Sequence, residues 1–134
     1  MEIRIGCSGW NYKSWLGVLY PPGTPFSNFL RYYSISFGTV EIDSSFYAIP
    51  AESTIRRWKE SVPDGFLFCP KVPKTITHNM EKSEVSEDIE TFLRRIRLLG
   101  NRLGTILLQF PPSFSQGTGM SFLNNLLEHL PDDL

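Results

Sequence analysis

Short apolar runs alternate with amphipathic segments along the chain. Four runs have the length of strands, and each is followed by small, polar or proline residues that end the apolar pattern. They cover residues 3–7, 39–44, 66–71 and 105–110. We predict these runs as four β-strands.

The segments between the runs repeat apolar residues at spacings of three and four, which is typical of helices with one buried face. The first helix follows the proline-rich stretch 20–25 and is expected to be capped near Ser27. A second follows Pro50, and a third runs from about Ser86 to a C-cap at Gly100. Ser121 is the expected cap of the last helix.

Strands that alternate with helices predict a parallel sheet with right-handed crossovers. Two architectures fit this α/β pattern, half of a TIM-like (β/α)8 barrel or a small doubly wound sheet. The second usually has a glycine-rich turn after its first strand, and residues 6–9 match that fingerprint poorly. Polar residues at the end of every strand favour the barrel. We therefore predict one (β/α)4 domain over residues 1–134, with four strands and four helices.

Composition narrows the class of protein. The chain has 134 residues, is 41% hydrophobic and carries a formal net charge of -1, which argues against disorder and against a strong basic field for duplex nucleic acid. Neither Cys7 nor Cys69 lies in a paired motif, so we expect no disulfide or zinc site. No apolar run approaches the length of a membrane span. The expected setting is the reducing cytoplasm, without a membrane partner.

Two carboxylates lie in the second predicted strand. Glu41 and Asp43 point to the same face because side chains alternate along a strand, and Lys71 ends the neighbouring strand. In a barrel all three would lie at the active-site end, where we predict them as catalytic residues. The carboxylates could also bind a divalent cation, or form a structural ion pair with Lys71. Without a histidine cluster we assign no metal ligands.

Further polar residues follow the other strands. Lys74 and His78 lie in the connection after the third strand, where a lysine can hold a phosphate and a histidine can titrate near neutral pH. Ser8 follows the first strand, and Gln109 lies near the end of the fourth. We predict all four as ligand-binding residues, although Lys74 and His78 are also consistent with ordinary surface positions.

Aromatic residues follow the first two strands. Trp10 and Tyr12 come after the first strand, and Tyr47 comes after the second. Their rings are expected to wall the same end of the sheet, where aromatic planes can stack on bases or sugars. We predict these three as ligand-binding residues and Trp15 as part of the core.

Four sequence blocks resemble the YecE-like family, which is defined by a domain of unknown function. The blocks are IRIGCSGWNYKSW (3–15), TVEIDSSFYAIP (39–50), FCPKVPKTITH (68–78) and LGTILLQFPPSF (103–114), and they follow the family's order and spacing. The resemblance implies a TIM-like barrel, related to endonuclease IV-type barrels and hence to nucleic-acid binding or repair. Asp43 stands where the family usually has asparagine. A full barrel needs roughly 250 residues, so the chain corresponds to the N-terminal half of such a protein.

Three functions are therefore open. The first is an enzyme that binds or processes a phosphate-bearing ligand such as a nucleic acid, which by fold analogy would be a metal-assisted phosphodiester hydrolase. The second is a noncatalytic module that binds nucleotides or oligonucleotides. The third is an inactive structural fragment of a longer barrel.

Both outer strands of the predicted sheet are apolar. Residues 3–5 and 106–108 carry neither the prolines nor the inward lysines that usually protect a sheet edge. We therefore expect either a homodimer that buries these edges or a longer protein whose C-terminal half covers them.

Overall fold

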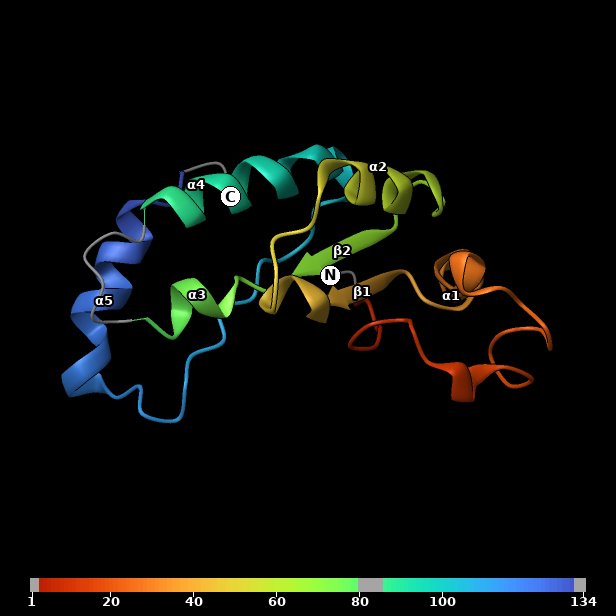
Figure 1. Cartoon of the computed structure of the whole chain (residues 1–134), viewed down its shortest axis with the longest axis horizontal. Coiled ribbons are helices and arrows are strands. Elements are labelled where there is room, and N and C mark those ends of the chain that lie inside the picture. The colour runs from red at the N-terminus through yellow and green to blue at the C-terminus, as the bar shows by residue number, and fades with distance from the viewer. Residues whose placement is uncertain (1–2, 80–85, 132–134) are drawn as a thin grey trace.

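The structure is a computed structural model that describes residues 3–79 and 86–131. Its elements are η1 (Lys13–Trp15), η2 (Phe26–Asn28), α1 (Phe29–Ser36), β1 (Thr39–Ile42), η3 (Asp43–Phe46), α2 (Glu52–Glu60), β2 (Leu67–Pro70), α3 (Lys74–Thr77), α4 (Ser86–Ile96), η4 (Arg97–Arg102) and α5 (Gln116–Glu128), where η marks a 3-10 helix. Helices α1 and α5 lie at opposite ends, with α2 and α4 between them (Figure 1). Helices α1, α2, α4 and α5 therefore arch over one side of the two strands, and α3 lies outside this arch.

Helices are present in all four regions where the periodicity predicts them. Two details differ. The last helix begins at Gln116, not at Ser121, and it includes Gly119, where a Cβ would collide with the ring of Phe114. The short helix α3 occupies a stretch expected to be a loop. Gly100 has φ 60°, which explains why the regular helix α4 ends before it.

The prediction of a four-stranded half barrel is wrong. Among the described residues the sheet has only two strands, β1 and β2, and it is not closed. The two strands are parallel, with Glu41 opposite Cys69. A doubly wound sheet is not formed either. Both architectures predict parallel pairing of strands, and this part of the fold prediction is confirmed by β1 and β2.

The other two predicted strands run beside this sheet without becoming strands. Ser8, which follows the first segment, forms a single bridge with Glu41 of β1. Near the last segment, Leu103 forms a bridge with Phe68 of β2, and Leu107 forms one with Lys71, which follows β2. Each of these segments pairs with the sheet at isolated bridges, whereas β1 and β2 pair at four successive positions. The segments therefore lack the continuous ladder of hydrogen bonds that makes a strand.

The two faces of the sheet differ in burial. Val40, Ile42 and Phe68 are almost completely buried, whereas the alternate positions Glu41 and Cys69 are half-buried. The buried face packs into an apolar cluster that also contains Tyr33 of α1 and Ile55 of α2. A second apolar cluster lies around α4, α5 and Phe92 and contains no residue of β1 or β2. The half-exposed face is the one that carries the carboxylates.

In the described ranges no helix is long and apolar enough to cross a membrane.

Tyr33 of α1 links the first segment to β1. Its hydroxyl accepts a hydrogen bond from the backbone N–H of Cys7 at 2.6 Å and donates to the carbonyl oxygen of Thr39 at 2.9 Å. The side chain is fully buried, and this burial raises the pKa of the Tyr33 phenol to about 12. The Tyr33 hydroxyl therefore bridges the N–H of Cys7 and the carbonyl oxygen of Thr39, which lie on two neighbouring extended segments.

Candidate functional site

An ion-paired cluster lies where β1 and β2 end. The Nζ atom of Lys71 lies 2.9 Å from Oε1 of Glu41 and 2.7 Å from Oδ1 of Asp43. The Lys71 side chain is 11% exposed, whereas those of Glu41 and Asp43 are 29% and 45% exposed. The lysine is thus the buried centre of the cluster, and the carboxylates face solvent. One positive and two negative groups leave a net negative charge.

Two serines hold this cluster in place. Ser8 donates a hydrogen bond to Oε1 of Glu41 at 2.6 Å. The buried hydroxyl of Ser45 lies 2.7 Å from the carbonyl oxygens of both Ile42 and Lys71, so it can donate to either. Ser45 therefore connects the end of β1 to the residue that follows β2. This contact fixes the backbone from which Lys71 projects.

The protonation of Lys71 reflects two opposing effects. Desolvation by burial acts to lower its pKa. Hydrogen bonds to Asp43 and Glu41, together with their charges, outweigh that effect and raise the pKa above its ordinary value. Lys71 is therefore a cation at neutral pH and not a base.

A cavity of about 320 Å³ opens beside the cluster. Asp43 lines one side of it, and Tyr12 and Tyr47 supply aromatic surface. The hydroxyl of Tyr12 donates a hydrogen bond to the carbonyl oxygen of Ser8, which ties this wall to the carboxylate network. The remaining lining residues are Gly9, Trp10, Asn11 and Ser44.

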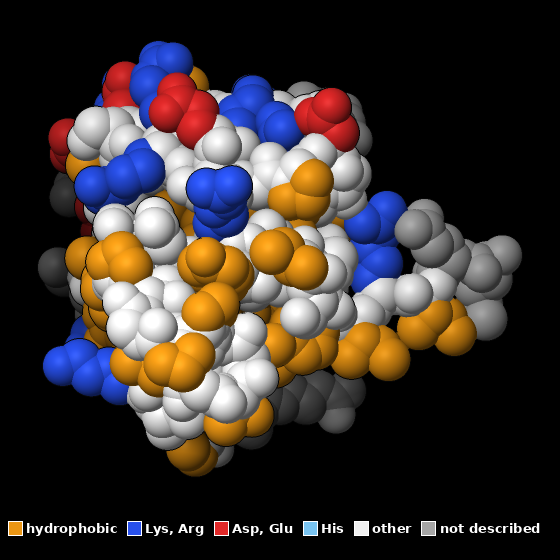
Figure 2. All heavy atoms as spheres, turned by 90° about the vertical axis from the view of Figure 1, so that its right-hand side faces the viewer, with side chains coloured by type: hydrophobic (Ala, Val, Ile, Leu, Met, Phe, Trp, Pro, Cys, Tyr) orange, Lys and Arg blue, Asp and Glu red, His pale blue; other side chains and the backbone are white. Residues whose placement is uncertain are grey.

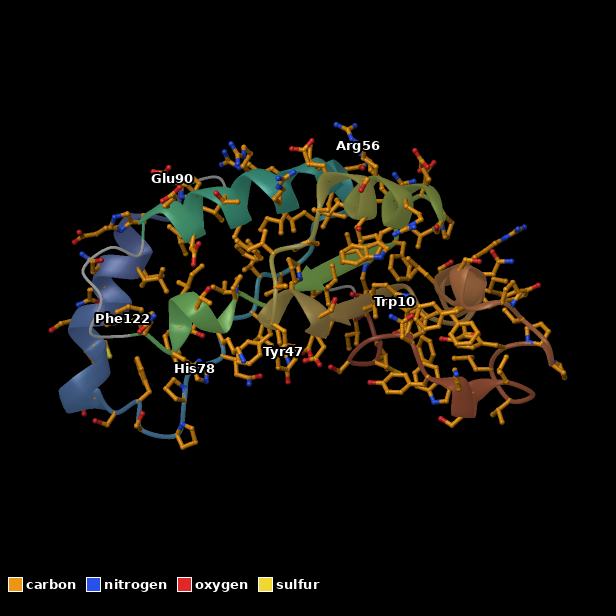
Figure 3. The ribbon with its side chains drawn as sticks, viewed as in Figure 1. Trp10, Tyr47, Arg56, His78, Glu90 and Phe122 are labelled. Atoms are coloured by element: carbon orange, nitrogen blue, oxygen red, sulfur yellow. The ribbon has the colours of Figure 1, made fainter. Side chains whose placement is uncertain are left out.

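The short helix α3 brings two more predicted residues to this side of the molecule. The Nζ atom of Lys74 lies 5.2 Å from the centre of the Tyr47 ring, and Tyr47 is 64% exposed. The ring of His78 meets the ring of Phe46 edge to face at 5.3 Å. Tyr47 and His78 lie away from α2 and α4, whose Arg56 and Glu90 project from the opposite side (Figure 3).

Two predicted ligand-binding residues lie differently from the rest. Trp10 is only 6% exposed, and its ring packs edge to face against that of Trp58 at 5.4 Å. Trp10 is therefore mainly a core residue, although it also lines the cavity. Gln109 is exposed but is not among the residues lining the cavity. Trp15 packs against the core, as the sequence predicts.

Sequence reasoning overlooks Ser45 as a part of the site. Ser44 and Ser45 are adjacent, and only their burial distinguishes them: Ser45 is 1% exposed, whereas Ser44 is exposed and lines the cavity. Their place directly after a strand is the only sequence signal available. It does not reveal which hydroxyl turns inward.

The donor set does not fit a divalent cation. Within residues 3–79 and 86–131, no group of three or more His, Cys, Asp or Glu side chains is arranged to hold a metal ion. The two carboxylates of the cluster already share the ammonium of Lys71, which a cation would have to displace. Cys7 and Cys69 are half-buried free thiols and add no paired donors.

Known proteins resemble the chain over most of its length. Residues 4–134 match the family described as "Protein of unknown function DUF72". The UPF0759 protein YecE of Escherichia coli K12 is 31% identical over 133 residues, covering 98% of this chain and 45% of that protein. YunF of Bacillus subtilis 168, also a UPF0759 protein, is 33% identical over 119 residues, covering 84% of this chain and 41% of the relative. The chain thus spans about half the length of the curated relatives it matches.

Solved structures agree with this assignment. A DUF72 family protein from Thermotoga maritima MSB8 superposes with a TM-score of 0.80 at 32% identity, covering 96% of this chain and 52% of that one. A second DUF72 family protein, from Enterococcus faecalis V583, has a TM-score of 0.78 at 24% identity, over 98% of this chain and 48% of its own. The profile match over residues 4–134, supported by these structures, shows that the chain belongs to the DUF72 family.

Proposed function

We propose that the carboxyl edge of the sheet binds a phosphate-bearing ligand, with a nucleotide or a single-stranded nucleic acid as the favoured class. The observation that carries this proposal is the exposed ring of Tyr47 with the Lys74 ammonium 5.2 Å from its centre. The Lys74 ammonium lies over the face of this ring, and a base can stack there when the lysine swings aside to meet the phosphate. The adjoining cavity of about 320 Å³ offers room for part of the ligand.

The ion-paired cluster has a supporting role in this proposal. Lys71 is already engaged by Glu41 and Asp43, and the net charge of the three residues is negative, so they do not form a phosphate site by themselves. The carboxylates are better suited to accept hydrogen bonds from ribose hydroxyls or base amino groups. Lys74 then supplies the cation that the phosphate needs.

Binding can be tested by fluorescence anisotropy with a short labelled single-stranded oligonucleotide at several salt concentrations. Loss of a stacked base weakens binding by roughly 5- to 150-fold, so we expect Tyr47→Ala to fall in this range. Lys74→Ala should reduce the slope of log affinity against log salt by about 0.7. Phe26→Ala is the matched control, because Phe26 is 59% exposed but lies in η2, outside the site.

The proposal fails if neither the oligonucleotide nor a mononucleotide binds at micromolar concentrations, or if Tyr47→Ala and Phe26→Ala have equal effects. Mononucleotides titrated by the same method separate a nucleotide site from one that needs a longer strand. Binding by mononucleotides alone would identify a nucleotide site and limit the proposal to that class.

A second candidate function is chemical processing of the same ligand. The hydrogen-bonded series Ser8, Glu41, Lys71, Asp43 favours it, because a carboxylate held between a hydroxyl and an ammonium can act as a general base. Turnover of a bound oligonucleotide or nucleotide should then be lost in Glu41→Gln while binding persists. Glu60→Gln, an exposed change on α2, is the control. Binding without turnover in the unchanged protein favours the noncatalytic function.

A further inference from the structure

The chain exposes more surface than a compact protein of its mass. Its accessible surface is 8322 Å², whereas a folded monomer of 15.3 kDa is expected to expose roughly 7,100 Å². The excess of about 1,200 Å² is larger than the roughly 800 Å² that each partner buries in a standard protein interface. In the described part of the chain the sheet has two strands and is open at both edges.

One edge of the sheet carries protruding apolar side chains. Ile3 and Ile5 are 74% and 73% exposed. Cys7 packs against the core beneath α1, while Ser8 reaches Glu41 on the open face. Alternation along an extended segment therefore places Ile3 and Ile5 on the side of the helices. Among the described residues no strand pairs with the outer side of this segment.

The opposite edge carries a matching apolar hollow. A groove of about 840 Å³ runs along residues 103–108, and Leu103, Ile106 and Leu108 contribute its apolar lining. Ile106 and Leu108 pack against the cluster beneath α4 and α5, so the groove also lies on the side of the helices. Its further lining residues include Val72 and Leu130.

We propose that two copies of this chain associate edge to edge, with Ile3 and Ile5 of each copy in the groove along residues 103–108 of the other. Each copy has one edge with protruding isoleucines and one edge with a groove. Two copies related by a twofold axis can therefore bury both edges of both copies at the same time. The pair also amounts to about the length of one curated relative, since the chain covers 45% of YecE. Both edges gain an outer neighbour, which the isolated chain lacks.

The first test measures the oligomeric state of the 134-residue chain by light scattering during size-exclusion chromatography at micromolar concentrations. The expected mass is twice the 15.3 kDa of one chain. Ile5→Lys places a charge in the apolar groove and should raise the dissociation constant at least about tenfold. The position is 73% exposed, so the variant should remain folded, which circular dichroism checks.

Ile35→Lys is the matched control. Ile35 is 75% exposed in α1, at the end of the molecule that faces the viewer in Figure 2, where hydrophobic side chains are visible on the surface. This surface takes no part in the proposed contact, so the control should remain dimeric. A monomeric unchanged chain, or equal effects of Ile5→Lys and Ile35→Lys, would overturn the proposal.

A photocrosslink tests the geometry directly. Benzoylphenylalanine is introduced at position 5, and chains labelled with heavy and light isotopes are mixed. We expect it to crosslink to residues 103–108 of the other copy. Such a crosslink joins one heavy and one light peptide, which distinguishes it from a crosslink within one chain. Capture of α1, or crosslinks found only within one chain, would rule out the proposed edge contact.

Discussion

Lys71, which follows β2, holds its Nζ atom 2.7 Å from Oδ1 of Asp43, which follows β1. The contact joins two connections that leave the sheet on the same side. Because Nζ also lies 2.9 Å from Glu41, one ammonium balances two carboxylates that sit two residues apart on a strand. The cluster therefore stabilises the edge on which any ligand site here would be built.

Removing the ammonium should cost stability. Lys71→Met leaves Glu41 and Asp43 close together without a counter-charge, and we expect a loss of about 1–2 kcal/mol, since both carboxylates keep partial contact with water. Urea unfolding provides the measurement, with an unchanged m-value as the check that the folded state is retained. Lys74→Met, at an exposed position, should change stability by less than about 0.5 kcal/mol. Equal losses in the two variants would show that the ion pairs contribute nothing specific.

Stability should also fall at high pH. The pKa of Tyr33 is raised to about 12 from the ordinary value of 10.0, so the folded protein holds this proton more tightly than the unfolded chain does. The stabilisation is complete below pH 10 and is lost as the pH rises towards 12. The raised pKa of Lys71 acts in the same direction above its ordinary value of 10.5.

Tyr33→Phe tests the tyrosine's share of this effect. The change removes the hydroxyl that joins Cys7 to Thr39 and should cost about 1–3 kcal/mol at neutral pH. It should also make the loss between pH 10 and 12 smaller by on the order of 2 kcal/mol. Urea unfolding at a series of pH values measures both. An unaltered pH dependence in the variant would assign the alkaline loss to other groups.

Gly6 is predicted to be intolerant of any side chain. A Cβ at this position would collide with the carbonyl oxygen of Thr39, so Gly6→Ala must push the first segment away from β1. We expect a loss of about 1–3 kcal/mol in thermal or urea unfolding. Gly117→Ala in α5 is the opposite case, because nothing lies within 4 Å of its Cβ, and it should stabilise by up to about 1 kcal/mol.

The buried hydroxyl of Ser45 should contribute more than that of its neighbour. Ser45→Ala leaves the link between the carbonyls of Ile42 and Lys71 unmade, and we expect a loss of about 1–2 kcal/mol. Ser44→Ala, at an exposed position, should be nearly neutral. Hydrogen exchange at the N–H of Lys71 would report local loosening. If the exchange rate is unchanged in Ser45→Ala, the hydroxyl does not hold the two strand ends together.

The positions of Glu41, Asp43 and Lys71 follow from sequence because two rules combine. Alternation puts the two carboxylates on one face, and parallel strands bring the end of β2 beside the end of β1. A lysine stem is long enough to cross between neighbouring strands. Local pattern and pairing are sufficient here, and no knowledge of the remaining packing is required.

The outer strands and Trp10 could not be placed in this way. An apolar run predicts extended backbone, but whether it becomes a strand depends on continuous pairing with a neighbour, and residues 105–110 pair only at one isolated bridge. Trp10 follows a strand end just as Tyr47 does, yet Trp58 of α2 covers its ring. The burial of Trp10 depends on α2, which is distant in sequence, and the residues around Trp10 do not predict that contact.

The Tyr33 hydroxyl has a consequence for how the site can move. Because it holds both Cys7 and Thr39, α1 is coupled to the first segment by a side chain and not only by backbone pairing. Ser8, the next residue along, hydrogen-bonds Glu41. We therefore expect a displacement of α1 to shift Cys7 and, through the neighbouring Ser8, the hydrogen bond to Glu41, although α1 lies at one end of the molecule (Figure 1). The surface of α1 is in this sense joined by two side-chain hydrogen bonds and one peptide unit to the carboxylate of Glu41.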